Sequence, residues 1–281
     1  MEFGYNDYIK IKEKTEGKIL IENENIFLEI GKEIKLNGIN PIDFDIEVSN
    51  VWSFPDRGTW ATHKLNVKFR GNWSPYVPRN LILLYSQEGD LILDAFCGSG
   101  TTLIEAKLLR RKAIGVDINP YFLAISYDRL IPFSEPGKDI KLFLGNATNL
   151  EFIENESVDF ICTHPPYANA IKYSNIEGDL SRISNIESFL DRMEEVAKEF
   201  YRVLKRGKIC AFMIGDIRRN KKHILLAYKT LERFLKVGFE LKEDIIKIQH
   251  NMKTTPLWKN KAKEKGFLLL SYEHIFVCVK P

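Results

Sequence analysis

The chain has 281 residues, of which 44% are hydrophobic and 12% aromatic. This composition supports a large hydrophobic core and excludes a generally disordered protein. The 41 basic and 38 acidic side chains leave a net charge of +3, but residues 216–265 carry 14 Lys and Arg against 6 Asp and Glu, a local charge of +8. One basic region in a nearly neutral chain is compatible with nucleic-acid binding.

Residues 1–50 are predicted to form a small β-rich accessory segment. Within them, KILIENENIFLEI (18–30) has two β-type runs on either side of Glu22–Asn25, which predicts a hairpin. Residues 51–77 are rich in Trp, Pro, Arg and Gly and are expected to be an ordered loop. PRNLILLYS (78–86) has helical spacing, and Pro78 suits a first helical turn.

From residue 90 onward, apolar strand patterns alternate with helical ones. The expected strands are 90–96, 112–118, 139–145, 157–163, 208–216, 239–249 and 267–280, and the expected helices are 101–111, 120–130, 186–205 and 223–238. Such alternation predicts a mostly parallel sheet covered on both faces. No helix separates the last two strands, so they are expected to pair antiparallel. The predicted fold is therefore a Rossmann-like, doubly wound α/β domain over residues 51–281, with an antiparallel final strand.

Three features exclude other classes of protein. No apolar run approaches the roughly 18 residues of a membrane helix, and the start MEFGYNDYIKIKEK lacks the apolar core of a signal peptide. None of the four cysteines, Cys97, Cys162, Cys210 and Cys278, belongs to a CxxC pair. This pattern indicates buried free thiols rather than disulfides or a zinc site. We therefore expect a cytoplasmic protein with no membrane association and no bound metal.

DAFCGSGTT (94–102) follows the first strand of the predicted sheet, where Gly98 and Gly100 allow a tight turn and close approach to a ligand. Asp117 ends the next strand, 19 residues after Gly98, a spacing at which a carboxylate meets ribose hydroxyls. An ordinary β-turn-α crossover is one alternative. A dinucleotide site is another, but Leu103 replaces its third glycine. Asp94 suits a positively charged ligand better, and S-adenosylmethionine carries a sulfonium and an ammonium group.

A second motif follows the fourth strand, which runs into Thr163-His164-Pro165-Pro166-Tyr167. Two prolines end a buried strand sharply and fix the backbone outside the sheet. The following aromatic ring is then placed at the same edge as the glycine turn. Alone, Pro-Pro-Tyr would be unremarkable as a loop, but its position after an acidic, glycine-rich turn makes it far more specific.

Together, DAFCGSGTT and THPPY resemble the cofactor and catalytic motifs of amino-group DNA methyltransferases. GNWSPYVPRNLILLY (71–85) resembles the family's helix-bearing motif that holds the methionine end of the cofactor. The resemblance covers about residues 51–281 and implies an S-adenosylmethionine-dependent methyltransferase domain there. The implied cofactor contacts are Asp94, Phe96, Cys97, Gly98, Gly100, Thr101 and Asp117. Asn146 stands where the family often has an acidic residue near the adenine.

The resemblance also implies that His164, Pro165, Pro166 and Tyr167 carry the chemistry. Acceptors that bind the hydrogens of an exocyclic amine can stabilise it as it attacks the cofactor's methyl group. His164 departs from the family's Asp, Asn or Ser, yet a neutral histidine can accept through one ring nitrogen. Tyr167 is expected to stack on a flipped base. Cys162 is not next to a proline, so attack on a cytosine ring carbon is not favoured.

Basic segments near this edge are expected to bind the nucleic acid, although solvated charged faces are the alternative. The candidate residues are Arg218, Arg219, Lys221, Lys222, Lys253 and Trp258. No insertion of the size of a target-recognition domain is visible.

We therefore expect a site-specific DNA methyltransferase of the restriction–modification type. Its expected substrate is double-stranded DNA with a short recognition sequence, and a cognate restriction endonuclease is a candidate partner. The motif slightly favours cytosine N4 over adenine N6. The alternatives are a tRNA guanine amino-group methyltransferase and a catalytically idle nucleic-acid-binding subunit.

Overall fold

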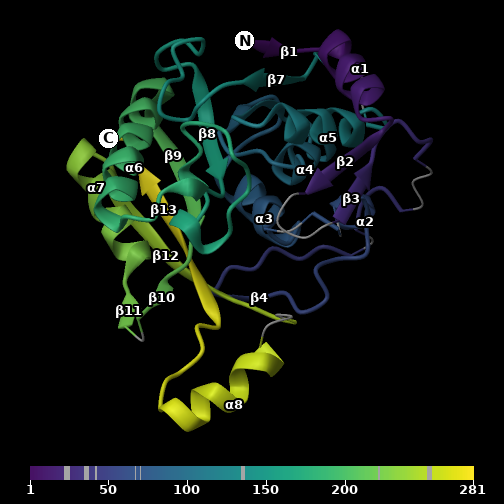
Figure 1. Cartoon of the computed structure of the whole chain (residues 1–281). Coiled ribbons are helices and arrows are strands. Elements are labelled where there is room, and N and C mark those ends of the chain that lie inside the picture. Colours follow the sequence, from purple (N-terminus) through teal and green to yellow (C-terminus); the bar gives the residue numbers. More distant parts are fainter. Residues whose placement is uncertain are drawn as a thin grey trace.

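The computed structural model shown in Figure 1 is built around one large sheet. It describes residues 1–21, 26–34, 38–41, 43–66, 68–69, 71–133, 137–220, 222–251 and 255–281. The sheet has nine strands in the order β1-β7-β6-β5-β8-β9-β13-β12-β4. Their bounds are β1 Glu2–Phe3, β4 Val51–Ser53, β5 Leu91–Asp94, β6 Lys112–Asp117, β7 Ile140–Leu144, β8 Val158–Thr163, β9 Leu204–Ile214, β12 Glu240–Ile248 and β13 Tyr272–Val279.

The pairing of these strands confirms the predicted Rossmann-like fold. β5, β6, β7, β8 and β9 run parallel to one another. β1 runs antiparallel to β7, and β13 runs antiparallel to both β9 and β12. The antiparallel final strand is therefore confirmed as well. The winding reverses between β5 and β8, because β6 and β7 lie on one side of β5 and β8 and β9 on the other. Ligands of such sheets bind at the carboxyl ends of the strands at this switch point.

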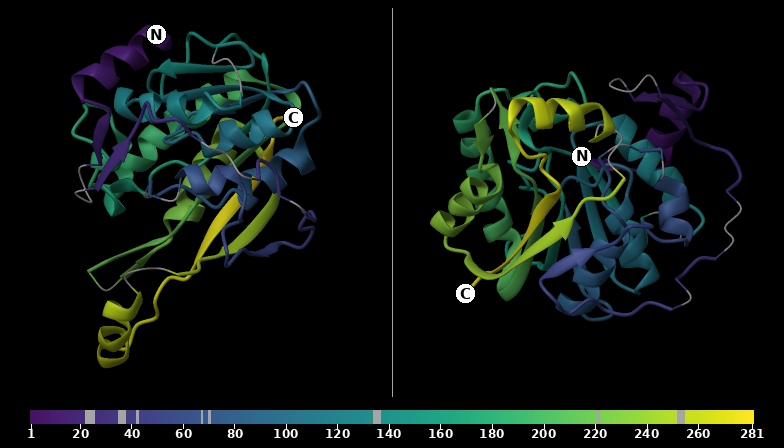
Figure 2. Two further views of the ribbon diagram at one scale, coloured as in Figure 1. Left: turned by 90° about the vertical axis from the view of Figure 1, so that its right-hand side faces the viewer. Right: turned by 90° about the horizontal axis from the view of Figure 1, so that it is seen from below.

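Helices cover both faces of the sheet (Figures 1 and 2). One layer holds α3 Tyr76–Tyr85, α4 Thr101–Leu108 and α5 Pro120–Leu130, and the other holds α6 Ile186–Val203 and α7 Leu226–Val237. α6 buries Phe189, Met193, Val196, Phe200 and Val203, a spacing of three and four residues that forms one apolar stripe. Burial of this stripe against the sheet fixes the layer.

The amino-terminal residues contain the expected hairpin and a helix that was not expected. β2 Lys18–Ile21 pairs antiparallel with β3 Ile26–Glu29, which confirms the hairpin, while its turn at 22–25 lies outside the described residues. α1 Tyr5–Lys14 packs on α5, and Tyr8 donates a hydrogen bond of 2.8 Å to Asp128. Tyr8 is the one side chain that α1 buries, so its sequence has no apolar periodicity to reveal it. The division of the chain at residue 50 stays a prediction.

Other elements also differ from the expected ones. The segment 51–77 contains β4 and a short helix, α2 Ala61–Asn66. After β9, the chain forms a small hairpin from β10 Ile217–Arg219 and β11 Lys222–Ile224. The segment between the last two expected strands, 239–249 and 267–280, contains a helix, α8 Thr255–Lys265, and Figure 2 shows this helix projecting from the body beside β10 and β11. Two short 3-10 helices, η1 Ala168–Ala170 and η2 Leu180–Arg182, follow β8.

All four cysteines are buried and free, as the sequence predicted. In the described part of the chain, we find no helix with the length and apolar character needed to cross a membrane.

Candidate active site

A cavity of about 790 Å³ opens at the carboxyl ends of β5, β6 and β8. It brings the glycine turn and the Pro-Pro-Tyr motif together. Its lining includes all four residues expected to carry the chemistry and all the expected cofactor contacts except Gly100. Gly100 instead caps the amino end of α4 with a left-handed backbone (φ 83°), and a Cβ there would lie 3.0 Å from Ser126 Oγ. It therefore shapes the turn and the packing of α4 on α5.

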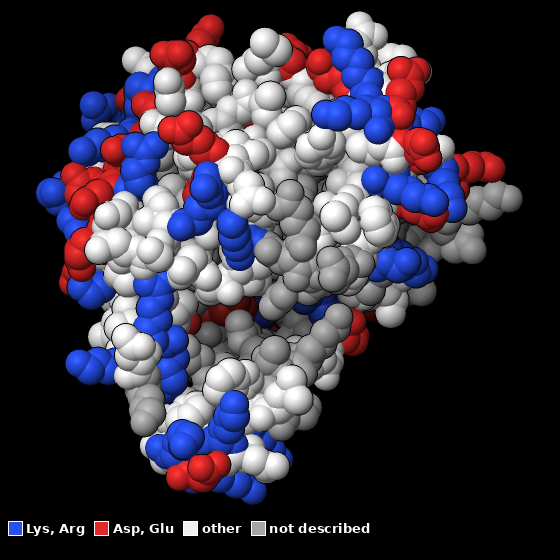
Figure 3. All heavy atoms as spheres, viewed as in Figure 1, with Lys and Arg blue, Asp and Glu red and all other residues white. Residues whose placement is uncertain are grey.

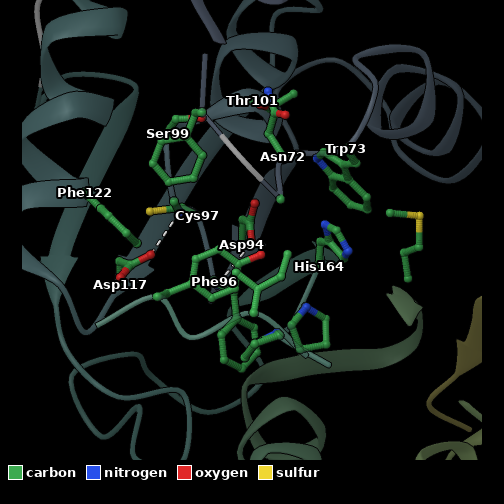
Figure 4. A pocket seen from close by; sticks show the side chains of 18 of the residues that line it. Asn72, Trp73, Asp94, Phe96, Cys97, Ser99, Thr101, Asp117, Phe122 and His164 are labelled. Atoms are coloured by element: carbon green, nitrogen blue, oxygen red, sulfur yellow. Dashed lines mark hydrogen bonds between the residues drawn. The ribbon is translucent and has the colours of Figure 1, made fainter. Parts of the chain in front are cut away.

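Asp117 receives two backbone hydrogen bonds at the end of β6. Gly98 N donates to Oδ2 at 2.9 Å and Asn119 N donates to Oδ1 at 2.8 Å. Burial raises the pKa of this carboxyl to about 7. These bonds hold the carboxylate in a fixed position beside the glycine turn, at one end of the cavity (Figure 4).

Asp94 links the two motifs. Its Oδ1 accepts hydrogen bonds from Thr163 Oγ1 at 2.6 Å and from Phe96 N at 3.1 Å. Burial raises the pKa of Asp94 above its ordinary value, although these hydrogen bonds partly oppose the shift. Because Thr163 directly precedes His164, the contact fixes the start of the second motif against the first. Figure 4 shows Asp94 between Asp117 on one side and His164 on the other.

His164 lies at the other end of the cavity against Trp73. The two rings are stacked, with centroids 5.4 Å apart and an interplanar angle of 17°. Its Nε2 lies 2.7 Å from the hydroxyl of Tyr167. Burial lowers the pKa of His164 to about 4, so the imidazole is neutral at physiological pH. A neutral ring keeps one nitrogen as a hydrogen-bond acceptor.

The sequence reasoning missed two charged residues that complete this end of the cavity. Tyr167 donates its hydroxyl proton to Glu273 Oε1 at 2.6 Å, and Lys247 Nζ donates to Glu273 Oε2 at 2.9 Å. Lys247 and Glu273 are direct partners across β12 and β13. The signal that could have revealed them is Glu273 at the start of the mostly apolar run 274–279, in a strand expected to pair antiparallel with the strand that holds Lys247.

The cavity's donors and acceptors fit S-adenosylmethionine. Ser99 Oγ and Thr101 Oγ1 are buried and have no hydrogen-bond partner among the described residues, and both side chains line the cavity. Their hydroxyls suit a carboxylate such as that of the cofactor's methionine part. Asp94 suits its ammonium and Asp117 its ribose hydroxyls. The cavity volume lies within the range of about 300–1,000 Å³ that is usual for ligand pockets.

Four of the expected nucleic-acid contacts lie on β10, β11 and α8, at the bottom of the view in Figure 1, and two of them contact other parts of the protein. Arg218 donates to the carbonyl oxygen of Leu268 at 3.0 Å, and Arg219 contacts Asn169 and Ser184. These contacts brace the β10–β11 hairpin. Further along the chain, Trp258 on α8 is 47% exposed, and Lys222 on β11 is exposed. Lys221 and Lys253 lie outside the described residues.

A family model described as DNA methylase matches residues 2–128 and 158–281. The chain belongs to the DNA methylase family. The match begins in the opening segment, which the motif resemblance did not reach. A second model, described as an RMKL-like methyltransferase domain, matches residues 81–214 of this chain. Both models include β5, β8 and the two motifs, so the cavity is that of an S-adenosylmethionine-dependent methyltransferase.

The relatives of this chain include a tRNA methyltransferase and several Type II methyltransferases. The tRNA (guanine(10)-N2)-dimethyltransferase of Methanocaldococcus jannaschii is 29% identical over 195 residues, which are 66% of this chain and 53% of that protein. The Type II beta methyltransferase M.BslI of a Bacillus species is 29% identical over 168 residues, 53% of this chain and 17% of that protein. The chain thus spans about half the length of the Methanocaldococcus jannaschii enzyme and a smaller share of M.BslI.

Among solved structures, TrmN from Thermus thermophilus has the same fold. Its TM-score is 0.54 at 18% identity, over 78% of this chain and 53% of that one. At this identity the likeness shows the fold alone.

Asp117 predicts a pH dependence of cofactor binding. Ribose hydroxyls donate hydrogen bonds to the ionised carboxylate, and a group with a pKa of about 7 is mostly protonated at pH 6. We expect the dissociation constant of S-adenosylmethionine to be about tenfold higher at pH 6 than at pH 8. Calorimetric titration across this range measures it. Asp117→Asn should bind S-adenosylmethionine more weakly, and its dissociation constant should vary less with pH. Titration of the ligand's own ammonium group affects binding to both proteins equally, so the variant serves as the control. An equally steep profile for the variant would contradict the role of Asp117.

Proposed function

We propose that the chain is a site-specific DNA methyltransferase that methylates the exocyclic amino nitrogen of a flipped base. The observation that carries this proposal is the DNA methylase match over both halves of the chain. The cavity supports it, because a buried cofactor pocket and a neutral imidazole meet in one space. S-adenosylmethionine supplies an electrophilic methyl group when it is bound.

The residues of the chain then have separate tasks. Asp117 holds the ribose, Asp94 holds the ammonium, and Asn146 lies beside the adenine. His164 accepts one hydrogen bond from the target amine, and a backbone carbonyl of the Pro165–Pro166 segment accepts another. Such an acceptor stabilises the amine as positive charge develops on its nitrogen. The ring of Tyr167 lines the cavity and stacks on the base.

The target base is proposed to be cytosine, methylated at N4, in preference to adenine. An acidic first position in the motif is typical of adenine methylation, and His164 is neutral at physiological pH. Type II methyltransferases among the relatives support a role in restriction–modification, with a cognate endonuclease as the partner and a short recognition sequence in double-stranded DNA.

We propose that the β10–β11 hairpin and α8 bind the DNA backbone. α8 carries Lys259, Lys261, Lys263 and Lys265 against one acid, Glu264. Both elements project from the body of the molecule (Figure 2), beyond the carboxyl ends of β5, β6 and β8, whose following residues line the cavity. Figure 3 shows a hollow between the body and α8, with blue side chains over α8 and along the hairpin. Positive charge on both rims of a hollow suits a phosphate backbone.

Replacing lysines of α8 with glutamine should weaken DNA binding at every sequence. Each lost phosphate contact lowers the slope of log affinity against log salt by about 0.9, so the triple variant of Lys259, Lys263 and Lys265 should lose up to about 2.7 of slope. Fluorescence anisotropy with a labelled duplex at several salt concentrations measures this slope.

The matched control replaces three lysines of α1, at the opposite end of the molecule, namely Lys10, Lys12 and Lys14. We expect its slope to equal that of the unmodified protein. Equal slopes for the α8 and α1 variants would contradict the placement of DNA against α8.

The second candidate function is methylation of a guanine amino group in tRNA, which the similarity to the Methanocaldococcus jannaschii enzyme favours. Transfer of tritiated methyl groups from S-adenosylmethionine to duplex DNA or to tRNA transcripts separates the two. We expect incorporation into DNA. Incorporation into tRNA alone would replace the proposed function by the second candidate, and incorporation into neither would indicate an idle binding subunit.

A further inference from the structure

Tyr167 connects His164 to a buried ion pair, which Lys247 and Glu273 form. Lys247 and Glu273 are joined at 2.9 Å with side chains only 11% and 8% exposed. Glu273 accepts from the Tyr167 hydroxyl at 2.6 Å, and that hydroxyl lies 2.7 Å from His164 Nε2. The four polar groups therefore form one continuous chain that ends at the cavity.

The chemistry of the groups fixes the direction of every hydrogen bond. An ammonium only donates, and an ionised carboxylate only accepts. Tyr167 has a single hydroxyl proton, and it points to Glu273. The phenol oxygen can then only accept from His164, so Nε2 must carry the ring proton.

We propose that Lys247, Glu273 and Tyr167 hold His164 as its Nε2–H tautomer, which leaves Nδ1 as the acceptor for the target amino group. The assignment of that amino group as the target rests on the proposed function. Lys247, Glu273 and Tyr167 thereby act as positioning residues for the histidine, a role that the Asp, Asn or Ser of related motifs does not require.

The surroundings keep each member in the required state. Burial disfavours the charged form of Glu273, but the Lys247 ammonium and the hydrogen bonds outweigh it and lower the pKa of Glu273. Burial and the charge of Glu273 raise the pKa of Tyr167 well above its ordinary value. Burial lowers the pKa of His164, and the charges of Lys247 and Arg57 add to this effect, although the charge of Glu273 opposes it.

The geometry leaves Nδ1 as the only ring nitrogen available for a ligand. Trp73 covers a face of the imidazole, Tyr167 occupies Nε2, and Nδ1 has no hydrogen-bond partner among the described residues. Tyr167 is itself held in place by close packing. A Cβ at Gly215 would lie 2.8 Å from Tyr167 Cε2, so the absence of a side chain at Gly215 gives the ring its room.

Glu273→Gln should reverse the tautomer while keeping the shape of the side chain. The amide oxygen would face Lys247 and the amide nitrogen would donate to Tyr167, whose proton would then go to His164 Nε2. The imidazole would carry its proton on Nδ1 and could no longer accept there. We expect methyl transfer to DNA to fall by about 10²- to 10³-fold with unchanged affinity for S-adenosylmethionine. Tyr167→Phe, which leaves Nε2 without a partner, should give a mixture of tautomers.

Nitrogen-15 NMR of the histidine rings in the whole protein measures the tautomer directly. The chain has five histidines, and His164→Asn identifies the signal. We expect Nε2–H in the unmodified protein, Nδ1–H in Glu273→Gln and a mixture in Tyr167→Phe. An Nδ1–H ring in the unmodified protein, or the same tautomer in all three proteins, would overturn the proposal.

A matched control exists elsewhere in the fold. Tyr228 also donates to a carboxylate, Asp244 at 3.0 Å, which also contacts a histidine, His274 at 2.9 Å, outside the cavity. Tyr228→Phe should leave both the His164 signal and methyl transfer unchanged. If the unmodified protein shows the expected tautomer but transfers no methyl group to DNA, the tautomer assignment stands and the proposed function fails.

Discussion

His164→Ala is expected to lower the single-turnover rate of methyl transfer by about 10²- to 10³-fold, the usual loss when one acceptor or donor that stabilises a transition state is removed. The affinity for S-adenosylmethionine should change little, because Asp94 and Asp117 are untouched. Rapid-quench measurements with tritiated cofactor and a DNA duplex give the rate, and calorimetry gives the affinity.

His164→Asn separates a chemical role from a packing role. Its amide oxygen can accept a hydrogen bond, as in related motifs, but it loses the stacking on Trp73. We expect a rate between those of the alanine variant and the unmodified protein. Equal rates for the alanine variant and the unmodified protein would show that His164 is only a structural residue.

Asp94→Asn is expected to weaken cofactor binding by about 10- to 100-fold. The amide oxygen can still accept from Thr163 and Phe96 N, so the turn should keep its shape. The variant loses a hydrogen bond between charged groups, which is worth about 1.5–3 kcal/mol. Calorimetric titration with S-adenosylmethionine measures the change.

The control for Asp94→Asn is Asp191→Asn on the outer surface of α6, where the carboxylate lies 3.7 Å from Arg233 and is 69% exposed. This exposed pair should have no measurable effect on binding. Comparable dissociation constants for the two variants would show that Asp94 does not contact the ammonium group.

The meeting of the two motifs could be predicted because it depends on strand direction. Asp94, Asp117 and Thr163 each end a parallel strand, and the carboxyl ends of parallel strands share one edge of the sheet. Apolar runs and glycines were sufficient to locate those ends. The hydrogen bond between Thr163 and Asp94 is a direct consequence of this topology.

Contacts that depend on register could not be predicted in the same way. Lys247 meets Glu273 only in the observed pairing of β12 with β13, and a shift by one residue would place them on opposite faces. α8 buries only Ala262 among its described side chains, so its sequence has no periodic apolar pattern that would predict a helix. Arg218 and Arg219 were expected to face solvent or phosphate, but their contacts with Leu268 and Asn169 arise from loops distant in sequence.

The most direct test of the central claim is nucleoside mass spectrometry of DNA and tRNA from a host that expresses the protein, beside a host that expresses His164→Ala. We predict N4-methylcytosine, or N6-methyladenine if the base preference is wrong, in the DNA of the first host and a strong reduction in the second. Unmodified DNA together with newly methylated guanine in tRNA would contradict the assignment of DNA as the substrate.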